Sequence, residues 1–571
     1  MKNKKVFSIL LLLVLLSTLI VSTVSAKPSP TVDVQILAVN DFHGNLEPPA
    51  GSSGRIGTIN AGGAEYLATH INTLRALNPN TVVVSAGDMI GASPLLSALF
   101  HDEPSIEAFN AMGLDFNAVG NHEFDEGFVE LLRMQKGGCH PVDGCLDGDD
   151  FAGAKFKYLA ANVVFNDSDD EDDDDSKKNK DEDLKTLFPA YKIREFNSVK
   201  VAFIGMTLEG TPSIVTPSGV AGLTFLDEAD TVNALIPELK KEGVQTIVVL
   251  IHEGGAQVAP APYNGCEGIS GAIVDIVNRF DPEVDVVISG HTHNAYNCTI
   301  NNMLVTSAAS FGRVVTDVDL TINRKSGEVV SMSANNNIVT RDVAKDGFIT
   351  ALIAKYNAIA APLANRVIGV ITATITRTNN AAGESALGDV IADAQLYATA
   401  DPANGGAVIA FMNPGGIRTD LNFAGSTAGE GDGKVTYGES FAVQPFGNNL
   451  TTITMTGTQI KAVLEQQFNN PAAGQNRILQ ISNGFTYSWS LSAPVGSKIS
   501  NMMLNGVAIS DTSTYRVTVN SFLADGGDNF FAFKDGTDRL GGAVDTDALE
   551  KYFVAFPLVA PGPQNRITVL P

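Results

Sequence analysis

Lysine and arginine are scarce in this chain, and cysteine and tryptophan are scarcer still. Its 571 residues include 38 lysines and arginines against 63 aspartates and glutamates, four cysteines and one tryptophan, and the formal net charge is −25. So acidic a chain is a poor match for nucleic acid polymers or anionic membranes. Hydrophobic residues make up 44% and charged residues 18%, which argues against general disorder. The length exceeds one hydrophobic core, so we expect two large domains.

Long apolar runs are absent beyond the first residues. Lys2, Lys4 and Lys5 precede an apolar run that extends from residue 6 to about residue 24, and Ser25 and Ala26 supply small residues for cleavage. We therefore expect residues 1–26 to be a secretory signal peptide, the alternative being a retained membrane anchor. The mature protein is expected to be secreted, extracellular or periplasmic, with no stable membrane insertion.

The four cysteines lack the spacing of a thiolate metal site. An even number in an exported chain permits two disulfides, and four cysteines allow three pairings. Cys139 and Cys145 flank a short loop with a proline and a glycine, which favours a bond between them. The second disulfide would then join Cys266 to Cys298.

Residues 32 to about 320 alternate short β-branched runs with helical patterns, as an α/β domain does. The expected strands are residues 34–39, 81–85, 116–119, 201–204, 246–251 and 284–288. Expected helices lie between them at residues 64–77, 104–112 and 229–241. An acidic run at residues 166–183 cannot pack into a core. We expect a solvated, disordered insertion there, because the glycine and spaced glutamate of a calcium loop are missing.

Apolar residues recur at helical spacing over residues 346–365 and predict a helix. We expect a linker at residues 343–365, between a first domain at residues 27–342 and a second at residues 366–571. The second region is again α/β, with strands near residues 408–412, 450–455 and 515–519 and a helix at residues 386–397.

Polar clusters, most of them containing histidine, follow five of the expected strands. They are Asp41-Phe42-His43, Gly87-Asp88, Gly120-Asn121-His122-Glu123-Phe124-Asp125, His252-Glu253 and Gly290-His291-Thr292-His293. Because ligands of an α/β sheet bind beyond the carboxyl ends of its strands, we expect the clusters to converge on one rim. Carboxylate, imidazole and amide donors together suit a first-row divalent ion. The other histidines, His70, His101 and His140, are expected to be ordinary surface or loop residues.

This series of clusters resembles the metallophosphoesterase motifs, and the C-terminal half resembles the substrate-binding domain of secreted and periplasmic 5'-nucleotidases. The resemblance covers nearly the whole mature chain. It implies an α/β fold: a metallophosphoesterase β-sandwich flanked by helices (αββα), a linker helix and a C-terminal α/β substrate-binding domain. It further implies a hydrolase that dephosphorylates extracellular nucleoside 5'-monophosphates. UDP-sugar hydrolysis and 2',3'-cyclic-nucleotide phosphodiesterase or 3'-nucleotidase activity are alternatives within the same family.

The resemblance also implies two divalent ions (zinc, manganese, cobalt or magnesium) that share one aspartate and clamp the phosphoryl group. The residues implied for the first ion are Asp41, His43, Asp88 and His293, and those for the second are Asp88, Asn121, His252 and His291. His122 would contact the phosphate or protonate the leaving oxygen. Asp125 would hold the His122 ring in its tautomer, the alternative being an acid at a helix N-terminus.

In the second half, the resemblance implies that Phe446 and Phe522 sandwich the base and that Asp528 holds the ribose hydroxyls. Stacking of this kind contributes about 1–3 kcal/mol per base, although either phenylalanine taken alone would more often be a core residue. The other polar contacts are assigned to Asn413, Arg418 and Asn448. Arg418 follows a glycine turn and can bind phosphate with two hydrogen bonds, which supplies local positive charge in an acidic chain.

One position departs from the family pattern. The family carries an arginine directly before a helix start, whereas Arg377 lies several residues earlier here. We expect Arg377 to contribute to substrate binding. If Arg377 does not reach the site, the sequence does not indicate whether the enzyme prefers nucleoside mono-, di- or triphosphates. A binding protein on an inactive enzyme fold is disfavoured, because the set of metal-ligand residue types is intact.

Overall fold

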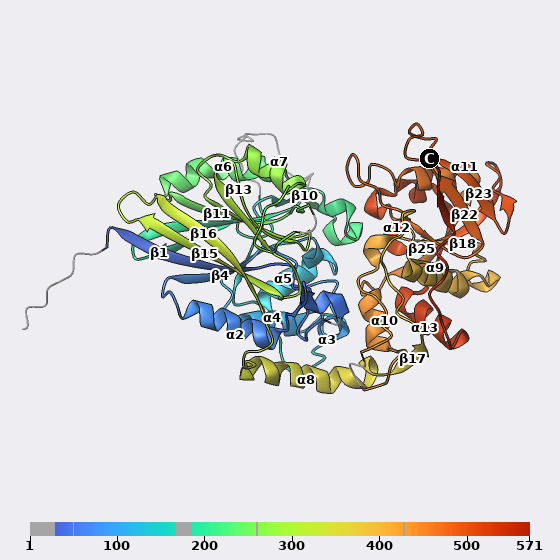
Figure 1. The fold of residues 1–571 in the computed structure, drawn as a ribbon, viewed down its shortest axis with the longest axis horizontal. Coiled ribbons are helices and arrows are strands. Elements are labelled where there is room, and N and C mark those ends of the chain that lie inside the picture. The colour runs from blue at the N-terminus through green and yellow to red at the C-terminus, as the bar shows by residue number, and fades with distance from the viewer. Residues whose placement is uncertain (1–28, 50, 167–184, 259–260, 426–428) are drawn as a thin grey trace, which may run out of the picture.

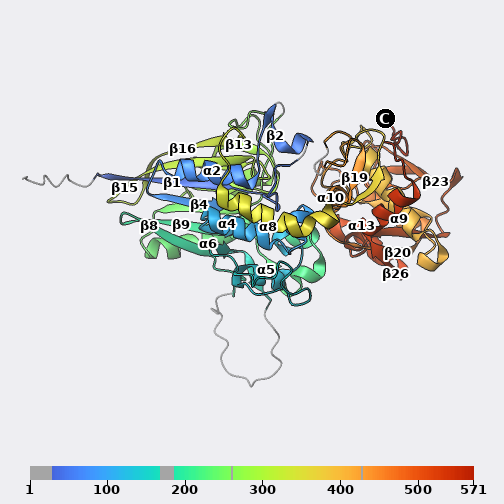
Figure 2. The same ribbon diagram turned by 90° about the horizontal axis from the view of Figure 1, so that it is seen from below.

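The computed structural model describes residues 29–49, 51–166, 185–258, 261–425 and 429–571. The expected signal peptide lies outside these ranges, as do residues 167–183 of the acidic run. Two α/β bodies lie side by side, the N-terminal one drawn in blue to green and the C-terminal one in orange to red (Figure 1). Helix α8 (Gly347–Ala364) lies at the lower edge of the molecule in Figure 1 and, seen from below, runs from the first body towards the second (Figure 2).

Two six-stranded sheets form the N-terminal half. The first has the order β16-β15-β1-β4-β5-β6, in which β1, β4, β5 and β6 are parallel. Its strands are β1 Thr31–Val39, β4 Thr81–Ser85, β5 Phe116–Ala118, β6 Lys157–Leu159, β15 Val314–Asn323 and β16 Val329–Ile338. The second has the order β13-β14-β12-β11-β9-β8, in which the four inner strands are parallel. Its strands are β8 Tyr191–Phe196, β9 Val199–Thr207, β11 Thr246–His252, β12 Val286–Ser289, β13 Ala295–Ile300 and β14 Met303–Ala308.

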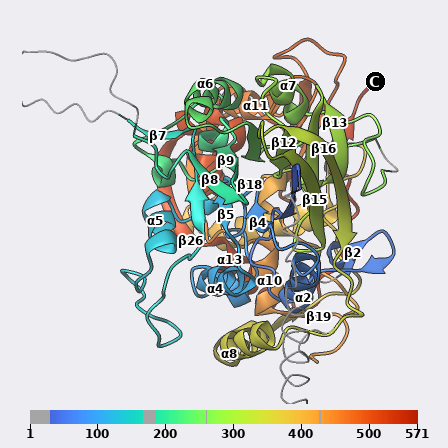
Figure 3. The ribbon, with the colours of Figure 1, turned by 90° about the vertical axis from the view of Figure 1, so that its left-hand side faces the viewer.

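The sheets pack face to face, with helices on both outer faces. Ile36 and Val84 of the first sheet share a core with Val248, Leu250 and Ile288 of the second. The outer helices are α2 Ala64–Arg75, α4 Glu103–Met112, α6 Glu228–Lys241 and α7 Ala272–Arg279. Helices α2, α4 and α8 cover the first sheet, and α6 and α7 cover the second (Figure 3). The expected αββα sandwich is therefore confirmed.

Several of the parallel strands covered on both faces, such as β4 and β11, are rich in β-branched residues, and this property made them visible in the sequence. The strand expected at residues 246–251 is fully buried in β11. The strand expected at residues 284–288 is β12, which begins two residues later, at Val286. Asp285 accepts a hydrogen bond from the Ile247 amide at 3.0 Å and so lies at the amino ends of these strands, opposite the polar clusters.

The C-terminal half contains a five-stranded sheet of order β21-β18-β25-β20-β26 and a four-stranded sheet of order β24-β23-β22-β27. The first comprises β18 Ile409–Met412, β20 Asn449–Thr456, β21 Gln480–Ile481, β25 Thr514–Asn520 and β26 Thr537–Val544. The second comprises β22 Phe485–Trp489, β23 Ile499–Leu504, β24 Val507–Ala508 and β27 Ile567–Val569. The main helices are α9 Ala386–Thr399, α10 Tyr437–Val443, α11 Gly457–Glu465 and α13 Asp545–Ala555. The α/β character expected for this half is present.

Among the described residues, α8 is the one helix long and apolar enough to cross a membrane, although no such run was expected beyond the signal. Asp346 caps it by accepting hydrogen bonds from the amides of Phe348 and Ile349. Ile349, Leu352 and Tyr356 are buried in the core that α8 shares with α2 and α4. These apolar residues of α8 therefore belong to the protein interior.

Candidate metal and phosphate site

The five polar clusters meet at the carboxyl ends of strands from both sheets. The segments after β1, β4 and β5 supply Asp41, His43, Asp88, Asn121 and His122, and β11 and the segment after β12 supply His252, His291 and His293. The backbone there is unusual: Asp41, His43, Asp88, His291 and His293 all have φ between +48° and +68°. Residues other than glycine occupy this region at a cost and collect at functional sites, where the surrounding structure holds them.

One group of donors consists of Asp41, His43 and His293, whose ligand atoms lie within 4.8 Å of one another. The Nε2 atoms of His43 and His293 are 3.1 Å apart, and Asp41 Oδ1 lies 3.3 Å from His293 Nε2. His43 Nε2 is also 3.7 Å from Asp88 Oδ2.

A second group consists of Asp88, His252 and His291. Asp88 Oδ2 lies 2.8 Å from His252 Nε2, and Asn121 Oδ1 lies 3.0 Å from His291 Nδ1. Asp88 therefore faces both groups.

Backbone carbonyls set the tautomers of two of these histidines. His43 Nδ1 donates to Gly91 O at 2.9 Å, and His252 Nδ1 donates to Ala86 O at 2.7 Å. The Nε2 lone pairs then point inward, as in histidines that bind metal. His252 Nε2 is buried and forms no well-directed hydrogen bond in the described part of the chain, yet it lies next to a carboxylate oxygen. This arrangement fits a shared cation.

The electrostatics favour an ionised Asp88 carboxylate and neutral rings at His43 and His291, but a protonated ring at His252. Burial would raise the pKa of Asp88, but the neighbouring imidazoles, His252 foremost, hold it well below its ordinary value. Burial lowers the pKa of His43 well below the usual range and that of His291 to about 3. Burial would also lower the pKa of His252, but the Asp88 carboxylate outweighs it and raises that pKa to about 10. The position between Asp88 and His252 thus favours a positive charge.

His122 and Asp125 form a separate pair beside these groups. Asp125 Oδ2 accepts a hydrogen bond from His122 Nδ1 at 2.8 Å, and the His122 amide donates to Asp88 Oδ1 at 2.9 Å. Burial would depress the pKa of the imidazole, but the carboxylates of Asp125 and Asp88 outweigh it and raise the pKa above its usual value.

Glu123 is a site residue that the sequence did not single out. It is 2% exposed, and its carboxylate accepts hydrogen bonds from the amides of Asp88 (2.8 Å), Met89 (2.9 Å) and Gly120 (2.7 Å). It therefore fixes the turns that carry Asp88 and Asn121 relative to each other. The only signal in the sequence was its place inside the cluster, directly after His122.

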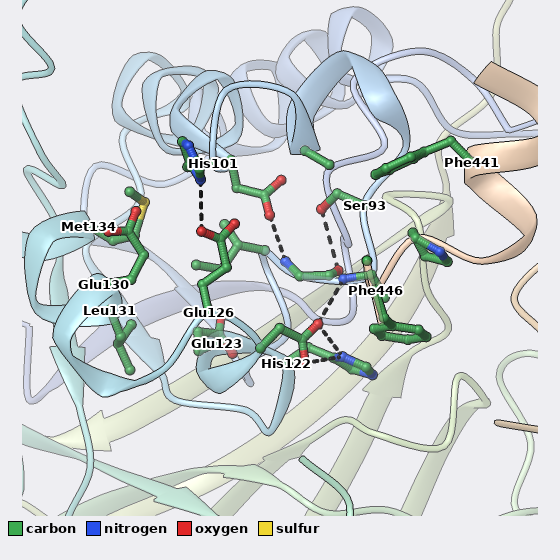
Figure 4. Close-up of a pocket in the computed structure, with 18 residues that line it drawn as sticks. Ser93, His101, His122, Glu123, Glu126, Glu130, Leu131, Met134, Phe441 and Phe446 are labelled. Atoms are coloured by element: carbon green, nitrogen blue, oxygen red, sulfur yellow. Dashed lines mark hydrogen bonds and ion pairs between the residues drawn. The ribbon is translucent and has the colours of Figure 1, made fainter. Parts of the chain in front are cut away.

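Residues of the C-terminal half reach the same rim. The Phe446 ring stacks on His122 with ring centroids 5.7 Å apart and an angle of 18° between the planes (Figure 4). The Arg418 guanidinium lies 5.7 Å from the Phe446 centroid. Burial and the charge of Arg377 lower the pKa of Arg418, and Arg377 donates to Ile417 O at 3.0 Å. Arg377 therefore lies beside Arg418.

The remaining candidates form a polar network around Asp528. Its carboxylate accepts hydrogen bonds from Asn413 Nδ2 at 2.8 Å and from Arg477 at 2.5 Å, and it is 6% exposed. Asn448 Oδ1 accepts from the hydroxyl of Ser521, the residue before Phe522, at 3.1 Å. Phe522 packs against Gly527, the residue before Asp528. Arg477 was not predicted, because it lies 51 residues from Asp528 in the chain.

A cavity of about 250 Å³ adjoins His122 and is lined by both halves of the molecule (Figure 4). The N-terminal half contributes His101, Asp102, Asp125 and Glu126, and the C-terminal half contributes Phe446. His101 has more partners than the sequence indicated: its ring nitrogens bond Glu126 (2.7 Å) and Asp143 (3.0 Å), and its ring stacks on His140.

Both expected disulfides are present, Cys139–Cys145 and Cys266–Cys298. The first closes the loop that carries His140 and Asp143. Just after that loop, Asp147 accepts hydrogen bonds from Lys355 Nζ (2.7 Å) and the Tyr356 hydroxyl (3.0 Å), both on α8. The loop region is thus connected to the helix that joins the two halves.

Two family models match this chain: "Calcineurin-like phosphoesterase" over residues 34–295 and "5'-nucleotidase, C-terminal domain" over residues 367–535. Among curated proteins, endonuclease YhcR of Bacillus subtilis is 33% identical over 505 residues, which cover 87% of this chain and 37% of YhcR. Cell wall protein Lmo0130 of Listeria monocytogenes is 32% identical over 550 residues, covering 92% of this chain and 67% of that protein. Among solved structures, a 5'-nucleotidase precursor from Thermus thermophilus has a TM-score of 0.74 at 27% identity, covering 94% of this chain and 99% of that one.

Proposed function

Because the chain belongs to the 5'-nucleotidase family of metallophosphoesterases, we propose that it hydrolyses nucleoside 5'-monophosphates to nucleoside and phosphate. One observation carries the proposal: two groups of metal-type donors that share Asp88 lie beside an arginine and an aromatic ring supplied by the other half of the molecule. Metal ions held by such donors bind a phosphate, the arginine can pair with its charge, and the aromatic ring suits the base of a nucleotide.

Divalent ions are the cofactors of this family, and the donor set fits two of them. In our assignment Asp41, His43, Asp88 and His293 hold one ion, and Asp88, Asn121, His252 and His291 hold the other. Zinc, manganese, cobalt and magnesium are all compatible with these oxygen and nitrogen donors. Two such ions, when bound, activate water and neutralise phosphoryl charge.

His122 is placed to act on the leaving oxygen. Its Nδ1 proton is held by Asp125, so its Nε2 atom can donate a hydrogen bond or a proton. The raised pKa of the imidazole favours the protonated form that a general acid needs. Phe446 covers this ring, which limits access of water to it.

The C-terminal half would hold the nucleotide. We assign Arg418, with Arg377 beside it, to the phosphate, and Phe446 and Phe522 to the two faces of the base. Asp528 would accept hydrogen bonds from the ribose, and Asn413 and Asn448 would add polar contacts. Asp528 already accepts bonds from Asn413 and Arg477, which fix its carboxylate in one orientation.

The relative named an endonuclease makes polynucleotides the competing substrate class. The net charge of −25 opposes that reading, because polynucleotide binding rests on many phosphate contacts with basic residues. We also propose that the chain acts outside the cytoplasm. The sequence of residues 1–26, the two disulfides and the resemblance to a cell wall protein support that placement.

A substrate panel tests the proposal. The purified protein is stripped with a chelator, reloaded with each ion in turn, and assayed on AMP, UDP-glucose, 2',3'-cyclic AMP, phenyl phosphate and a short single-stranded DNA. We expect AMP to give the highest kcat/KM and the stripped protein to be inactive. A higher kcat/KM on UDP-glucose, cyclic AMP or DNA would reject the monophosphate assignment, and activity that survives stripping would reject the metal assignment.

A further inference from the structure

A single peptide unit, between Gly91 and Ala92, joins two parts of the site. Its carbonyl, Gly91 O, accepts the hydrogen bond from His43 Nδ1 at 2.9 Å. Its amide, Ala92 N, donates to Asp125 Oδ2 at 3.0 Å, and the same oxygen accepts from His122 Nδ1. Because a peptide unit is planar, its rotation would displace both hydrogen bonds together.

Local conformational preference does not hold this turn in place. Gly91 has φ of +78°, and Ala92, which is not a glycine, has φ of +48°. An L-residue is disfavoured in that region unless its surroundings impose it. A Cβ on Gly91 would lie 2.2 Å from His122 O and 2.7 Å from Asp125 Oδ2, so the turn also packs directly on the catalytic pair.

Asp102 supports the turn from outside it, in addition to the Ser93 hydroxyl, which donates to Gly91 O at 3.4 Å. Its Oδ2 accepts a hydrogen bond from the Gly91 amide at 2.9 Å, and the residue is 6% exposed. Asp102 stands at the N-cap of α4, where an aspartate commonly binds the amides of its own helix. It makes no such bond here, and Pro104 in the first turn lacks an amide hydrogen. The carboxylate is directed to Gly91 instead.

The preceding residue fixes Asp102 in turn. His101 and Asp102 have φ of +52° and +63°, two consecutive residues in the left-handed region. His101 is held by Glu126 and Asp143, one at each ring nitrogen, and its bond to Glu126 is visible in Figure 4. Since both ring nitrogens have protein partners, we interpret His101 as a structural residue that stabilises the segment before α4 rather than as a metal ligand.

We propose that Asp102 is a positioning residue for the reaction: by holding the amide of Gly91, it fixes the turn whose next peptide orients His43 among the metal-type donors and, through Asp125, the ring of His122. This inference rests on the proposed function. The feature that matters is the acceptor at Oδ2, not the negative charge, because the bond is to a neutral amide.

Asp102→Ala removes the acceptor and Asp102→Asn keeps one. At saturating metal we expect Asp102→Ala to lower kcat on AMP about tenfold or more, but to lower kcat on 4-nitrophenyl phosphate much less, because that leaving group needs little protonation. Its half-saturating metal concentration should rise about tenfold, as for other residues that orient metal ligands. Asp102→Asn should restore both quantities to within about threefold of the wild type.

The matched control is Asp285→Ala, which removes another carboxylate bonded to a backbone amide, at the opposite ends of the strands. It should leave both quantities unchanged whatever it does to the melting temperature. If Asp102→Ala does not fold, Asp102→Ser is used in its place, because the serine side chain is too short to reach the Gly91 amide. Its kcat and half-saturating metal concentration are compared with the wild type in the same way. The inference is wrong if the Asp102 variant behaves like the Asp285 control, or if Asp102→Asn is as impaired as Asp102→Ala. An inactive wild type would instead reject the proposed function.

Discussion

His122 differs from the other histidines of the rim in what holds its Nδ1 atom. Carbonyl oxygens hold the Nδ1 atoms of His43 and His252, whereas a carboxylate holds that of His122. A carboxylate stabilises the charged ring in a way that a neutral carbonyl does not. His122 is therefore suited to carry and deliver a proton, while the other two are suited to present a lone pair.

Replacing His122 by alanine should lower kcat on AMP by about 10²–10⁴, the usual contribution of a general acid. Bound metal, measured by elemental analysis, should stay at the wild-type level, because the assigned ligand atoms are untouched. His70→Ala is the control, since His70 bonds the carbonyl of Thr340 at 3.1 Å. A His122→Ala enzyme with near-normal turnover would contradict the assignment.

His101 should make stability depend on pH. Burial would lower the pKa of its ring, but the hydrogen bond to Glu126 and the neighbouring carboxylates outweigh it and raise the pKa above 6.5. A raised pKa contributes stability that is complete below the unfolded value of about 6.5 and is lost as pH rises through the folded value. The groups facing the ring are Glu126, Asp143, Glu130 and His140.

His101→Gln should therefore destabilise the protein more at pH 6 than at pH 9, because the variant lacks the charged ring that the carboxylates stabilise. Denaturant unfolding of the variant and the wild type at the two pH values measures the difference. A cost that is the same at both pH values would mean that folding does not raise the pKa of the ring.

At the scale of elements, the turns after the strands define the site. Gly120 lies in the turn after β5, where an added Cβ would stand 2.2 Å from Asp88 Oδ1 and 2.7 Å from the Asp88 amide. Asp88 cannot retreat, because Glu123 binds its amide and His252 faces its other oxygen. The turns that carry Gly120 and Asp88 can therefore approach each other this closely only because Gly120 has no side chain.

Gly120→Ala should weaken metal binding by about 10–100-fold, because it displaces the residue shared by both donor groups. Titration of the stripped protein with manganese or zinc, followed by activity, measures this. Gly347→Ala is the matched control, since a Cβ at Gly347 meets nothing within 4 Å. Equal metal affinity in the two variants would show that the turns have room to adjust.

Much of the N-terminal half could be predicted from the sequence, because its longer parallel strands, such as β4 and β11, are rich in β-branched residues and lead to the polar clusters. The αββα arrangement came from the resemblance to a known family. Glu123, Asp102 and Arg477 were not found. Each acts through hydrogen bonds to backbone amides or side chains that sequence spacing does not reveal. Asp102 in addition looks like an ordinary aspartate before a helix. The membrane-spanning composition of α8 was also missed, because polar residues such as Thr350, Lys355 and Asn357 interrupt its apolar sequence.

At the scale of the whole molecule, an acidic protein must concentrate positive charge where phosphate binds. Arg418 comes from the C-terminal half and faces the rim of the other, with Arg377 beside it. Helix α8 joins the halves and is anchored through Lys355 and Tyr356 to Asp147. The substrate residues and the metal-type donors therefore come from different bodies, and they meet only because the two bodies pack against each other in this orientation.

Arg418→Ala should raise KM for AMP about tenfold or more at unchanged metal content, since a charged, two-bond contact with phosphate is lost. The control is Arg324→Ala, because the half-buried Arg324 side chain bonds only the carbonyls of Ser29 and Asn197 among the contacts of the described residues, far in sequence from every assigned site residue. Steady-state kinetics at fixed ionic strength measures KM. An unchanged KM in Arg418→Ala would place phosphate recognition elsewhere.

The ring of Phe446 lies against the ring of His122, so one side chain belongs to both bodies at once. Any replacement of Phe446 made to admit a different ligand would also hydrate the imidazole beneath it. A substitution that changes substrate selectivity through Phe446 therefore also changes the rate of the chemical step. Selectivity for a different base can change without loss of turnover only at other positions, such as Phe522 or the residues around Asp528.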